Sequence, residues 1–592
     1  MDRSIQRTLI CTADTRTWPA EDRPLLFLGE WCLLHALKAE WERRDYRIVP
    51  YHWSDVERRH ADYRRLDALF EQLFLQLAEI LNDIHGTYHS LRYWRIVVGP
   101  WLRYFIGIMY DRFRALECAL DTGLVECVPV ISCSRWQQVP RNHADFFHEA
   151  LSDHGNQHIF RIICEHIAPE LVRTVAHEDF VRRNVGGRLR ELIGLGAFLV
   201  TSGGGALSRR RIVASLGYAK LGELIRLGRK FGQLLPFPIP KLRPREFPID
   251  AAVREKLSFD CERDTFSRLL ASTIKEFLPS AYLEGHPSMV RLAKAIYPRS
   301  AHLIIDDNAL HTNEVFKVWT AEAVENGTKL AIYQHGGFYG SGEWNENEIH
   351  ERSICDLFLN WGWESTSLAK PMPSYQLVRL KRRTFSPSPE IRRIAWIMTM
   401  FPRYAYLQTS MFSPSDILDY IDDQIRFYRA LPHEIASQLW LRPYQKDWDW
   451  SFINRLYKAG VDIEQICPPR ISMIEQLAKC RIGIFSANTT VHLEMFAMGI
   501  PTILYWNPKI WRIRQEAEPY YEALRGVGIL HDSPESAASW LKKIYKDAWI
   551  WWSSAEVQYA VSFHMERFGC TSDNWANEWK SRLSEVDFLP KR

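Results

Sequence analysis

A glutamine and a histidine stand directly before two glycines near the middle of the chain. The apolar stretch 331–333 is typical of the end of a buried strand, and Gln334, His335, Gly336 and Gly337 follow it. Adjacent glycines let a backbone approach a ligand closely or adopt a positive φ angle. In an α/β sheet, ligands gather at the carboxyl ends of the strands. We therefore expect this turn to present Gln334 and His335 to a ligand.

A run of acidic residues follows the glycines. It contains Glu343, Glu346, Glu348 and Glu351, together with the imidazole of His350. Such groups suit acid–base chemistry, but a glycine turn followed by a solvated acidic loop has the same composition. We interpret residues 343–351 as a mobile loop, and we look for chemistry first at His335 and at a polar loop upstream of it.

The upstream loop lies between a short apolar run, 303–305, and a helical pattern over 313–326 that Gly327 ends. The apolar run before Gln334 completes a strand, helix, strand unit. Parallel strands joined by one helix end at the same edge of a sheet. The upstream loop and the glycine turn are therefore predicted to converge. The chemically useful residues of this loop and of the helix start are Asp306, Asp307, Asn308, His311 and Glu314.

Another polar cluster begins a helix in the C-terminal part of the chain. The stretch RIGIFSANTTVHLEMFAMGIPTILYW predicts strand, helix and strand, with Ser486, Asn488, Thr489 and Thr490 at the helix start. The N–H groups and the dipole of a helix N-terminus attract phosphate or carboxylate. A plain helix cap needs one such residue, whereas four stand here. We expect them to bind an anionic donor, and Glu494 to accept hydrogen bonds from ribose hydroxyls.

Three further residues stand at the ends of predicted strands. Arg442 and Lys446 follow the strand in QLWLRPYQKDW, where cations could meet a phosphate. Glu30 comes directly after Gly29 in LLFLGEWC. It is either a ligand or base, or a carboxylate that stabilises a helix start.

Composition limits the functional classes. A chain of 592 residues exceeds one compact core, and 46% hydrophobic with 25% charged residues is ordinary for a globular protein. A net charge of +4 gives no global field for nucleic acid. The eleven cysteines show no zinc-site spacing, and no leader or apolar run of membrane-spanning length is present. We expect a cytoplasmic protein, with peripheral attachment to the inner face of the cytoplasmic membrane left open.

Residues 181–250 differ from their surroundings in composition. They contain glycine pairs and triplets, the run Arg209 to Arg211 and a proline-rich stretch. The glycines 203–205 lack the following Lys-Ser/Thr of a phosphate-binding loop. This segment is either a solvated insertion or a contact with an anionic membrane surface.

These patterns divide the chain into five parts. They are 1–180, the first part of an N-terminal α/β lobe; 181–250, a basic insertion or linker; 251–385, the second part of that lobe; 386–545, a C-terminal donor-binding α/β lobe; and 546–592, C-terminal helices that pack back.

Several motifs together resemble a known family. LLFLGEWC, YHW, RYWRIVVGPW, HTNEVFKVW, YQHGGFYG, NWGW, FSANTTVHLEMFAMGIPTILYW and WRIR are similar to bacterial transferases associated with surface-polysaccharide and O-antigen loci. More distantly, Arg442, the Gln-His-Gly turn and the Ser-x-Asn-Thr-Thr helix start resemble GT-B capsule transferases, including β-Kdo transferases and CDP-glycerol polymer synthases. The resemblance implies two Rossmann-like lobes with helical insertions. It also implies a nucleotide-activated donor on the C-terminal lobe and a glycan acceptor on the N-terminal lobe.

Chemistry assigns hypothetical roles within that frame. Glycosyl transfer needs a carboxylate base or nucleophile and a group that offsets charge on the departing phosphate. The carboxylate is Glu314, Asp307 or Glu30, and His335 with Arg442 stabilises the phosphate. The remaining donor-binding candidates are Gln334, Gly336, Gly337, Lys446, Ser486, Asn488, Thr489, Thr490 and Glu494. No convincing Asp-x-Asp loop is present, so we expect a metal-independent reaction with no cofactor besides the donor substrate.

Three functions compete at this point. The first is sugar transfer, for instance of a CMP-linked sugar acid, to a lipid-linked or growing glycan. A second is glycerophosphoryl transfer from a CDP-linked donor, and a third is a non-catalytic scaffold of glycan assembly. Binding of nucleic acid through residues 181–250 is disfavoured because the positive charge is only local.

Overall fold

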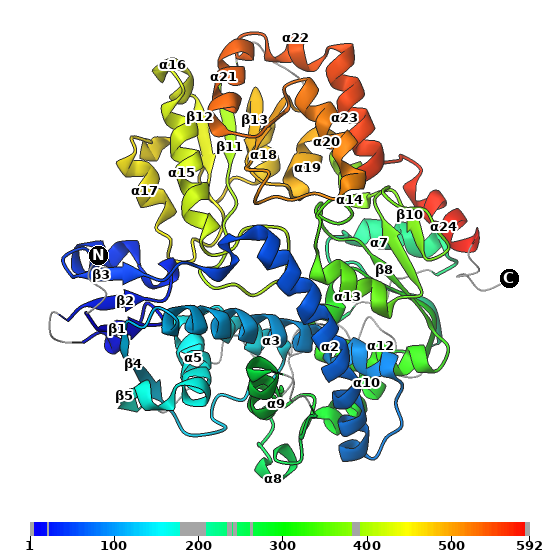
Figure 1. Cartoon of the computed structure of the whole chain (residues 1–592). Coiled ribbons are helices and arrows are strands. Elements are labelled where there is room, and N and C mark those ends of the chain that lie inside the picture. The colour runs from blue at the N-terminus through cyan, green and yellow to red at the C-terminus, as the bar shows by residue number, and fades with distance from the viewer. Residues whose placement is uncertain are drawn as a thin grey trace.

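Three parallel β-sheets form the frame of the protein (Figure 1). The structure is a computed structural model, and it describes residues 5–19, 23–177, 209–233, 239–240, 246–260, 264–381 and 391–585. The predicted glycine-rich turn at 203–205, and most of the segment proposed as a membrane contact, lie outside these residues. Each sheet has five strands.

The first sheet comes from the N-terminal part of the chain and has the strand order β3-β2-β1-β4-β5. Its strands are β1 (Arg7–Ile10), β2 (Leu25–Phe27), β3 (Tyr46–Ile48), β4 (Val125–Ser132) and β5 (Val172–His177). The helices that connect them are α1 (Lys38–Trp41), α2 (Val56–His85), α3 (Leu91–Leu120), α4 (His143–Ala150) and α5 (Asp153–Ile167).

The long helix α2 shows why the sequence folds locally as it does. Its apolar residues recur every three or four positions and are buried along one face, as the sequence predicts for residues 63–85. Asp55 accepts hydrogen bonds from the backbone N–H groups of Glu57 and Arg58 and so caps the helix start. Gly86, with φ of +62°, ends the helix in the left-handed conformation that glycine adopts without strain.

The second sheet has the order β10-β9-β8-β7-β6. Its strands are β6 (Arg209–Ser215), β7 (Ser300–Asp306), β8 (Lys329–Tyr333), β9 (Leu357–Asn360) and β10 (Ala369–Pro371). Its helices are α7 (Leu221–Lys230), α8 (Ala251–Arg254), α9 (Thr265–Phe277), α10 (His286–Ile296), α11 (Ala309–Thr312), α12 (Glu314–Glu325), α13 (Glu346–Ile354) and α14 (Tyr375–Lys381). The predicted strand, helix, strand unit is present as β7, α12 and β8, and the two strands pair in parallel.

The edge strand β6 lies within the segment that we interpreted as an insertion or linker. It pairs in parallel with β7, and its residues Ile212 and Val213 are buried. Residues 209–215 therefore belong to the second sheet.

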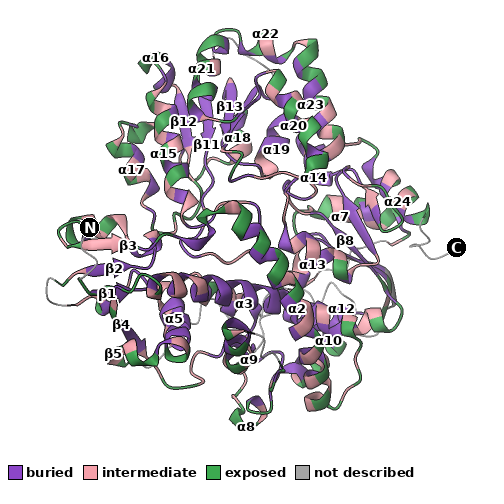
Figure 2. Cartoon of the chain, viewed as in Figure 1, coloured by how far each residue is buried: buried purple, intermediate pink, exposed green. Residues whose placement is uncertain are grey.

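The third sheet has the order β12-β11-β13-β14-β15. Its strands are β11 (Ile394–Ile397), β12 (Leu439–Arg442), β13 (Ile482–Phe485), β14 (Thr502–Tyr505) and β15 (Leu530–His531). Its helices are α15 (Asp416–Arg429), α16 (His433–Ala436), α17 (Phe452–Lys458), α18 (Met473–Leu477), α19 (Thr490–Met498), α20 (Glu518–Gly526), α21 (Pro534–Ile544) and α22 (Ala548–Trp552). The central strands are buried along their whole length, as expected for a parallel sheet covered on both faces (Figure 2).

The predicted α/β class is confirmed. The part of the chain expected to form one N-terminal lobe contains two sheets, because β1–β5 pair among themselves and β6–β10 form a separate ladder. Among the described residues, no helix combines the length and the apolar character needed to cross a membrane.

The last two helices, α23 (Ala555–Phe568) and α24 (Trp575–Glu585), lead from the third sheet back to the second (Figure 1). The ring of Trp579 lies 4.9 Å from that of Tyr333, and its indole N–H donates to the carbonyl of Pro373 over 3.0 Å. The backbone N–H of Cys570 donates to the carbonyl of Trp361. The C-terminal helices thus cover the strands whose ends form the candidate site.

We expect Gly362→Ala to destabilise this junction. Gly362 has φ of +132°, and an added Cβ would lie 2.3 Å from the carbonyl oxygen of Glu566 in α23. The control is Gly86→Ala, where φ is +62° and nothing lies within 4 Å of the added Cβ. The control should lose roughly 1–2 kcal/mol, the cost of a left-handed residue. Thermal unfolding should show a clearly lower midpoint for Gly362→Ala than for Gly86→Ala, and equal midpoints would contradict the packing described.

Candidate active site

The glycine turn of the second sheet touches the start of α19 in the third sheet. The backbone N–H of Gly337 donates a hydrogen bond of 2.9 Å to the hydroxyl of Thr490. A Cβ on Gly337 would lie 2.9 Å from the Cα and N atoms of Thr490, which leaves no room for a side chain. The two strongest polar clusters of the sequence, far apart along the chain, therefore meet at one place.

The loop after the glycines fastens the second sheet to the third. Gly342 pairs with Ile513 and Asn345 pairs with Thr409, each in an antiparallel bridge. The side chain of Arg514 donates to the carbonyl of Gly342 over 2.8 Å. Backbone and side-chain hydrogen bonds thus join this loop to the loops after β14 and β11.

The interpretation of residues 343–351 as a mobile loop is wrong. Residues 346–354 form α13, with Asn345 as its cap, because the side-chain oxygen of Asn345 accepts from the backbone N–H of Glu348. Glu346, Glu348, His350 and Glu351 are all buried. Glu348 forms an ion pair of 2.8 Å with Arg514.

Helix α13 brings a carboxyl group to His335. Glu351 Oε1 accepts a hydrogen bond of 2.9 Å from the hydroxyl of Tyr339. The same oxygen lies 2.9 Å from His311 Nε2 and 3.7 Å from His335 Nδ1. The hydroxyl of Tyr339 is also 3.2 Å from His335 Nδ1. Residues from three successive connections of the second sheet therefore surround one carboxyl group, which we call the Glu351 cluster.

Burial controls the protonation of this cluster. Desolvation raises the pKa of Glu351 to about 8, although the nearby His335 acts in the opposite direction. Burial lowers the pKa of His311 to about 4, and it also lowers the pKa of His335. At neutral pH the carboxyl is thus mainly protonated and both imidazoles are neutral. The side chain of His335 is 18% exposed, against 3% for Glu351, so the histidine is the member that can reach a ligand.

The two aspartates at the end of β7 have different partners. Asp306 accepts from the backbone N–H groups of Ala309 and Leu310 and holds the start of α11. Asp307 accepts from the backbone N–H of Gly217 over 2.9 Å and from the hydroxyl of Tyr375 over 3.3 Å.

Burial also raises the pKa values of these two carboxyls. For Asp306 the pKa rises to about 8, with the neighbouring Asp307 contributing, and for Asp307 it rises to about 6. Asp307 can therefore gain or lose a proton close to neutral pH. It lies on the same sheet edge as His335, but only 1% of it is exposed.

Glu314 and Glu30, the other predicted catalytic carboxylates, lie in different surroundings. Glu314 is 1% exposed, accepts from the backbone N–H of His143 over 3.1 Å, and pairs with Lys317 over 3.1 Å. It holds α12 against α4. Glu30 begins a 3₁₀ turn, Glu30–Cys32, after β2 of the first sheet, where burial, with Asp419 and Asp416 nearby, raises its pKa to about 7.

The predicted donor-binding residues at the start of α19 are brought together. Thr489 stands at the N-cap without a side-chain capping hydrogen bond, so it does not occupy the first N–H groups of the helix. Ser486 is buried and lies 3.1 Å from the hydroxyl of Tyr420. Asn488 accepts from the hydroxyl of Tyr521 over 2.9 Å, while its buried Nδ2 has no hydrogen-bond partner. A helix start of this kind is suited to bind an anion.

Gln334 orders the glycine turn. Its side-chain oxygen accepts from the backbone N–H of Trp361 and from the indole of Trp363, and its amide donates to the carbonyl of Gly336 over 2.7 Å. An added Cβ on Gly336 would lie 3.9 Å from the hydroxyl oxygen of Thr490. Gln334 is 1% exposed, so its structural role is to fix the turn that presents His335.

The remaining predicted residues border the third sheet. Arg442 donates to the side chain of Gln476 over 2.6 Å and to the carbonyl of Ile471 over 2.6 Å, so its guanidinium is held at the end of β12. The amine of Lys446 lies 3.5 Å from the centre of the Trp448 ring. Burial raises the pKa of Glu494 to about 7.

Sequence reasoning gave too little weight to Glu351 and did not consider Tyr339. Their signal was weak, because the partners of Glu351 stand 12 and 40 positions away along the chain. The pattern of α13, ENEIHERSI, is polar and has little helical periodicity.

A family model described as LIC12162 family transferase matches residues 7–583. Comparison with curated proteins finds no match.

Among solved structures, the chain is similar to three sugar-related proteins. They are a UDP-N-acetylglucosamine 2-epimerase (10% identity, 65% of this chain and 98% of that chain, TM-score 0.33), the wall teichoic acid polymerase TagF (9%, 68% and 98%, 0.31) and WaaG, a glycosyltransferase involved in lipopolysaccharide biosynthesis (10%, 64% and 100%, 0.27). At these TM-scores the similarity is remote and assigns no activity.

The contact between the turn and α19 predicts a contrast between two neighbouring glycines. Gly337→Ala places a Cβ against the backbone of Thr490, whereas the nearest atom to a Cβ on Gly336 is 3.8 Å away. We expect Gly337→Ala to lower the thermal midpoint and to speed amide hydrogen exchange in residues 338–345, because the turn must move off the helix. Gly336→Ala should behave like the wild type. Equal exchange in the two variants would disprove the close contact.

The protonation of Glu351 predicts a pH-dependent effect on stability. Its carboxyl ionises near pH 4.5 in the unfolded chain and near pH 8 in the folded protein. The unfolded state therefore binds fewer protons between these pH values, and this group's contribution to stability falls as pH rises from about 4.5 to about 8.

Glu351→Gln removes that dependence. The thermal midpoint of the variant minus that of the wild type should therefore increase steadily from pH 5 to pH 8. The exposed Glu516→Gln is the control and should give a constant difference. A constant difference for Glu351→Gln as well would show that this carboxyl is ionised normally.

Proposed function

The chain belongs to the LIC12162 family of transferases, and on that premise we propose that it transfers a sugar from a nucleotide-activated donor to a glycan acceptor. The carrying observation is the hydrogen bond of 2.9 Å between Gly337 and Thr490. It places the partly exposed His335 beside a helix start that lacks a side-chain cap. One site can therefore combine an acid–base group with an anion-binding group, which is the combination that this reaction requires.

The donor binds on the third sheet in this proposal. Its phosphate accepts hydrogen bonds from the first N–H groups of α19 and from the unpartnered amide of Asn488. The nucleoside lies along the carboxyl ends of the strands, where parallel sheets bind ligands. Glu494, in the first turns of the same helix, faces the ribose hydroxyls.

His335 acts as the general base. A base must contact the acceptor, and His335 is 18% exposed, whereas Asp307 and Glu314 are each 1% exposed. Its imidazole is neutral at pH 7 because burial lowers its pKa. It takes the proton of the acceptor hydroxyl while that oxygen bonds to the anomeric carbon of the donor. The bond from that carbon to the phosphate oxygen breaks, and the nucleotide leaves with the electron pair.

The other members of the Glu351 cluster position His335. Tyr339 and Glu351 lie on its Nδ1 side at 3.2 Å and 3.7 Å, and His311 supports Glu351 at 2.9 Å. Asp307, with a pKa of about 6, shares the sheet edge and holds the loop after β6 through Gly217.

The pathway in this proposal is bacterial surface-polysaccharide assembly, with a CMP-linked sugar acid as donor and a lipid-linked or growing glycan as acceptor. A CDP-linked glycerol donor would place its phosphate at the same helix start, so a donor panel separates the two reactions. The protein would work in the cytoplasm, at the inner face of the membrane that carries the acceptor.

The first test measures donor binding. Thermal unfolding is followed with CMP, CDP, UDP and GDP, and one nucleotide should raise the midpoint, because a ligand present at 100 times its Kd adds about 2.7 kcal/mol to stability. Asn488→Leu should weaken this stabilisation. Absence of stabilisation by every nucleotide would reject donor binding at this site.

The second test separates an enzyme from a scaffold. With the matching donor, His335→Gln should lower kcat by about 10²–10⁴, the range for loss of an acid–base group, while nucleotide stabilisation persists. The control is His302→Gln, an exposed histidine on β7. If His335→Gln leaves polysaccharide production intact in cells, the protein is a scaffold.

A further inference from the structure

The first sheet has its own ligand-binding geometry, which the proposed transfer does not use. Its order, β3-β2-β1-β4-β5, places β2 and β3 on one side of β1 and β4 and β5 on the other. The connections after β1 and after β4 therefore leave in opposite directions. In open parallel sheets, ligands bind in the crevice at the carboxyl ends of the two strands where this reversal occurs.

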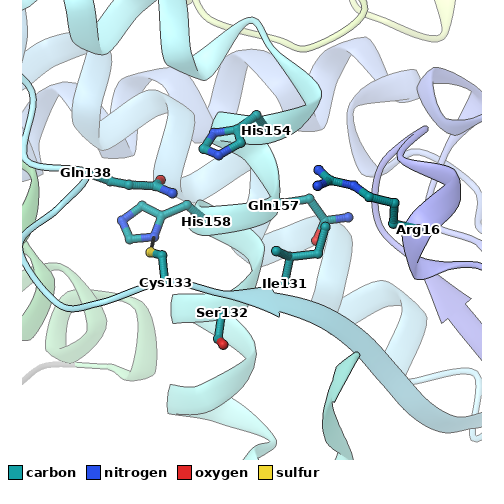
Figure 3. A pocket seen from close by; sticks show the side chains of 8 residues that line it. All are labelled: Arg16, Ile131, Ser132, Cys133, Gln138, His154, Gln157 and His158. Atoms are coloured by element: carbon teal, nitrogen blue, oxygen red, sulfur yellow. Dashed lines mark hydrogen bonds between the residues drawn. The ribbon is translucent and has the colours of Figure 1, made fainter. Parts of the chain in front are cut away.

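A pocket lies at that reversal (Figure 3). One wall is the end of β4 at Ile131 and the next residues, and another is the first part of α5 with His154, Gln157 and His158. Arg16, from the connection after β1, enters from the opposite side, and Figure 3 shows its guanidinium turned toward Gln157 and His154.

The lining of the pocket suits an oxyanion. It contains one guanidinium, two imidazoles and the amides of Gln138 and Gln157, and none of the described residues that line it is acidic. Two nearby carboxylates are paired elsewhere. Asp14 pairs with Arg16 over 2.6 Å, and Asp153 pairs with Arg403 over 2.5 Å.

Two of the lining side chains are held in place. Gln157 is 4% exposed, and its amide donates to the hydroxyl of Thr12 over 2.6 Å. His158 is 8% exposed, with Nδ1 lying 3.2 Å from Arg161. Buried polar groups fixed in this way form a built site, because no ordering of the side chains remains to oppose binding.

We propose that this pocket binds a small oxyanion, the phosphate or carboxylate group of a charged sugar, at a place separate from the donor site. Its empty volume of about 260 Å³ includes space open to solvent. Drug-sized ligands occupy roughly 300–1,000 Å³, so the pocket accepts a charged group while the rest of the ligand lies outside.

The pocket adjoins the contact between the first and third sheets. Asp153, next to His154 at the start of α5, accepts from the hydroxyl of Tyr404 over 2.5 Å, and it also binds Arg403. Both residues belong to the connection after β11, whose Gln408 donates its backbone N–H to Glu346 of α13. A bound oxyanion is therefore connected through this segment to the helix that carries Glu351.

Calorimetry with the full chain tests the proposal. The probes are inorganic phosphate, glucose 6-phosphate and glucuronate, with glucose as the uncharged comparison, and they are titrated in saturating nucleotide so that the α19 site is filled. At least one charged probe should bind and glucose should not. Tighter binding of the sugar probes than of phosphate identifies a charged glycan as the source, and the reverse identifies free phosphate. Absence of binding by all charged probes, or equal binding of glucose, overturns the proposal.

Paired variants locate the binding. Arg16→Gln should weaken the affinity of the bound probe at least tenfold. The control is Arg65→Gln, which removes an arginine of similar side-chain exposure, 47% against 49%, that also pairs with an aspartate. It should leave the affinity within twofold. His154→Gln provides a second lining variant in case Arg16→Gln disturbs its loop. Equal effects of the lining and control variants would place the bound ion elsewhere and overturn the proposal. Nucleotide stabilisation should be unchanged in all of them, which separates this result from the outcome for the donor site.

Discussion

The hydrogen bond from Gly337 to Thr490 sets the geometry on which the candidate site depends. It joins a strand end of one sheet to a helix start of another, with backbone too close for any side chain between them. The loop that follows then forms bridges to two connections of the third sheet. Because these contacts involve main-chain atoms, the relative position of His335 and α19 depends little on flexible side chains.

Desolvation is the second constraint, and it acts on several carboxyl groups at once. Burial raises the pKa values of Glu351, Asp306 and Asp307 into or near the neutral range. Such groups cost stability when ionised, and perturbed values of this kind concentrate at functional sites. Glu314 differs, because Lys317 and a backbone N–H from α4 balance its charge. Its surroundings suit a structural ion pair that joins two helices.

Local patterns predicted the elements and the convergence of the polar clusters. The unit of β7, α12 and β8 followed from strand and helix patterns with a glycine stop, and the start of α19 followed from four polar residues at one helix start. Contacts between distant segments could not be predicted in this way. Glu351 gains its chemistry from His311 and Tyr339, and nothing in ENEIHERSI indicates that its helix is buried. Likewise, β6 is a short strand after three arginines, and only its pairing with β7 places it in the second sheet.

The return of α24 to the second sheet has a consequence for synthesis. Tyr333 and Pro373 lie beside Trp579, which follows Pro373 by 206 positions and stands close to the end of the chain. During translation, the strand end that carries the glycine turn emerges long before the helix that covers it. The second sheet therefore keeps an uncovered apolar face on the ribosome until the last helices are made. Chains released early, by a premature stop before α24, would expose that face to chaperones and proteases even though all fifteen strands of the described sheets had been synthesised.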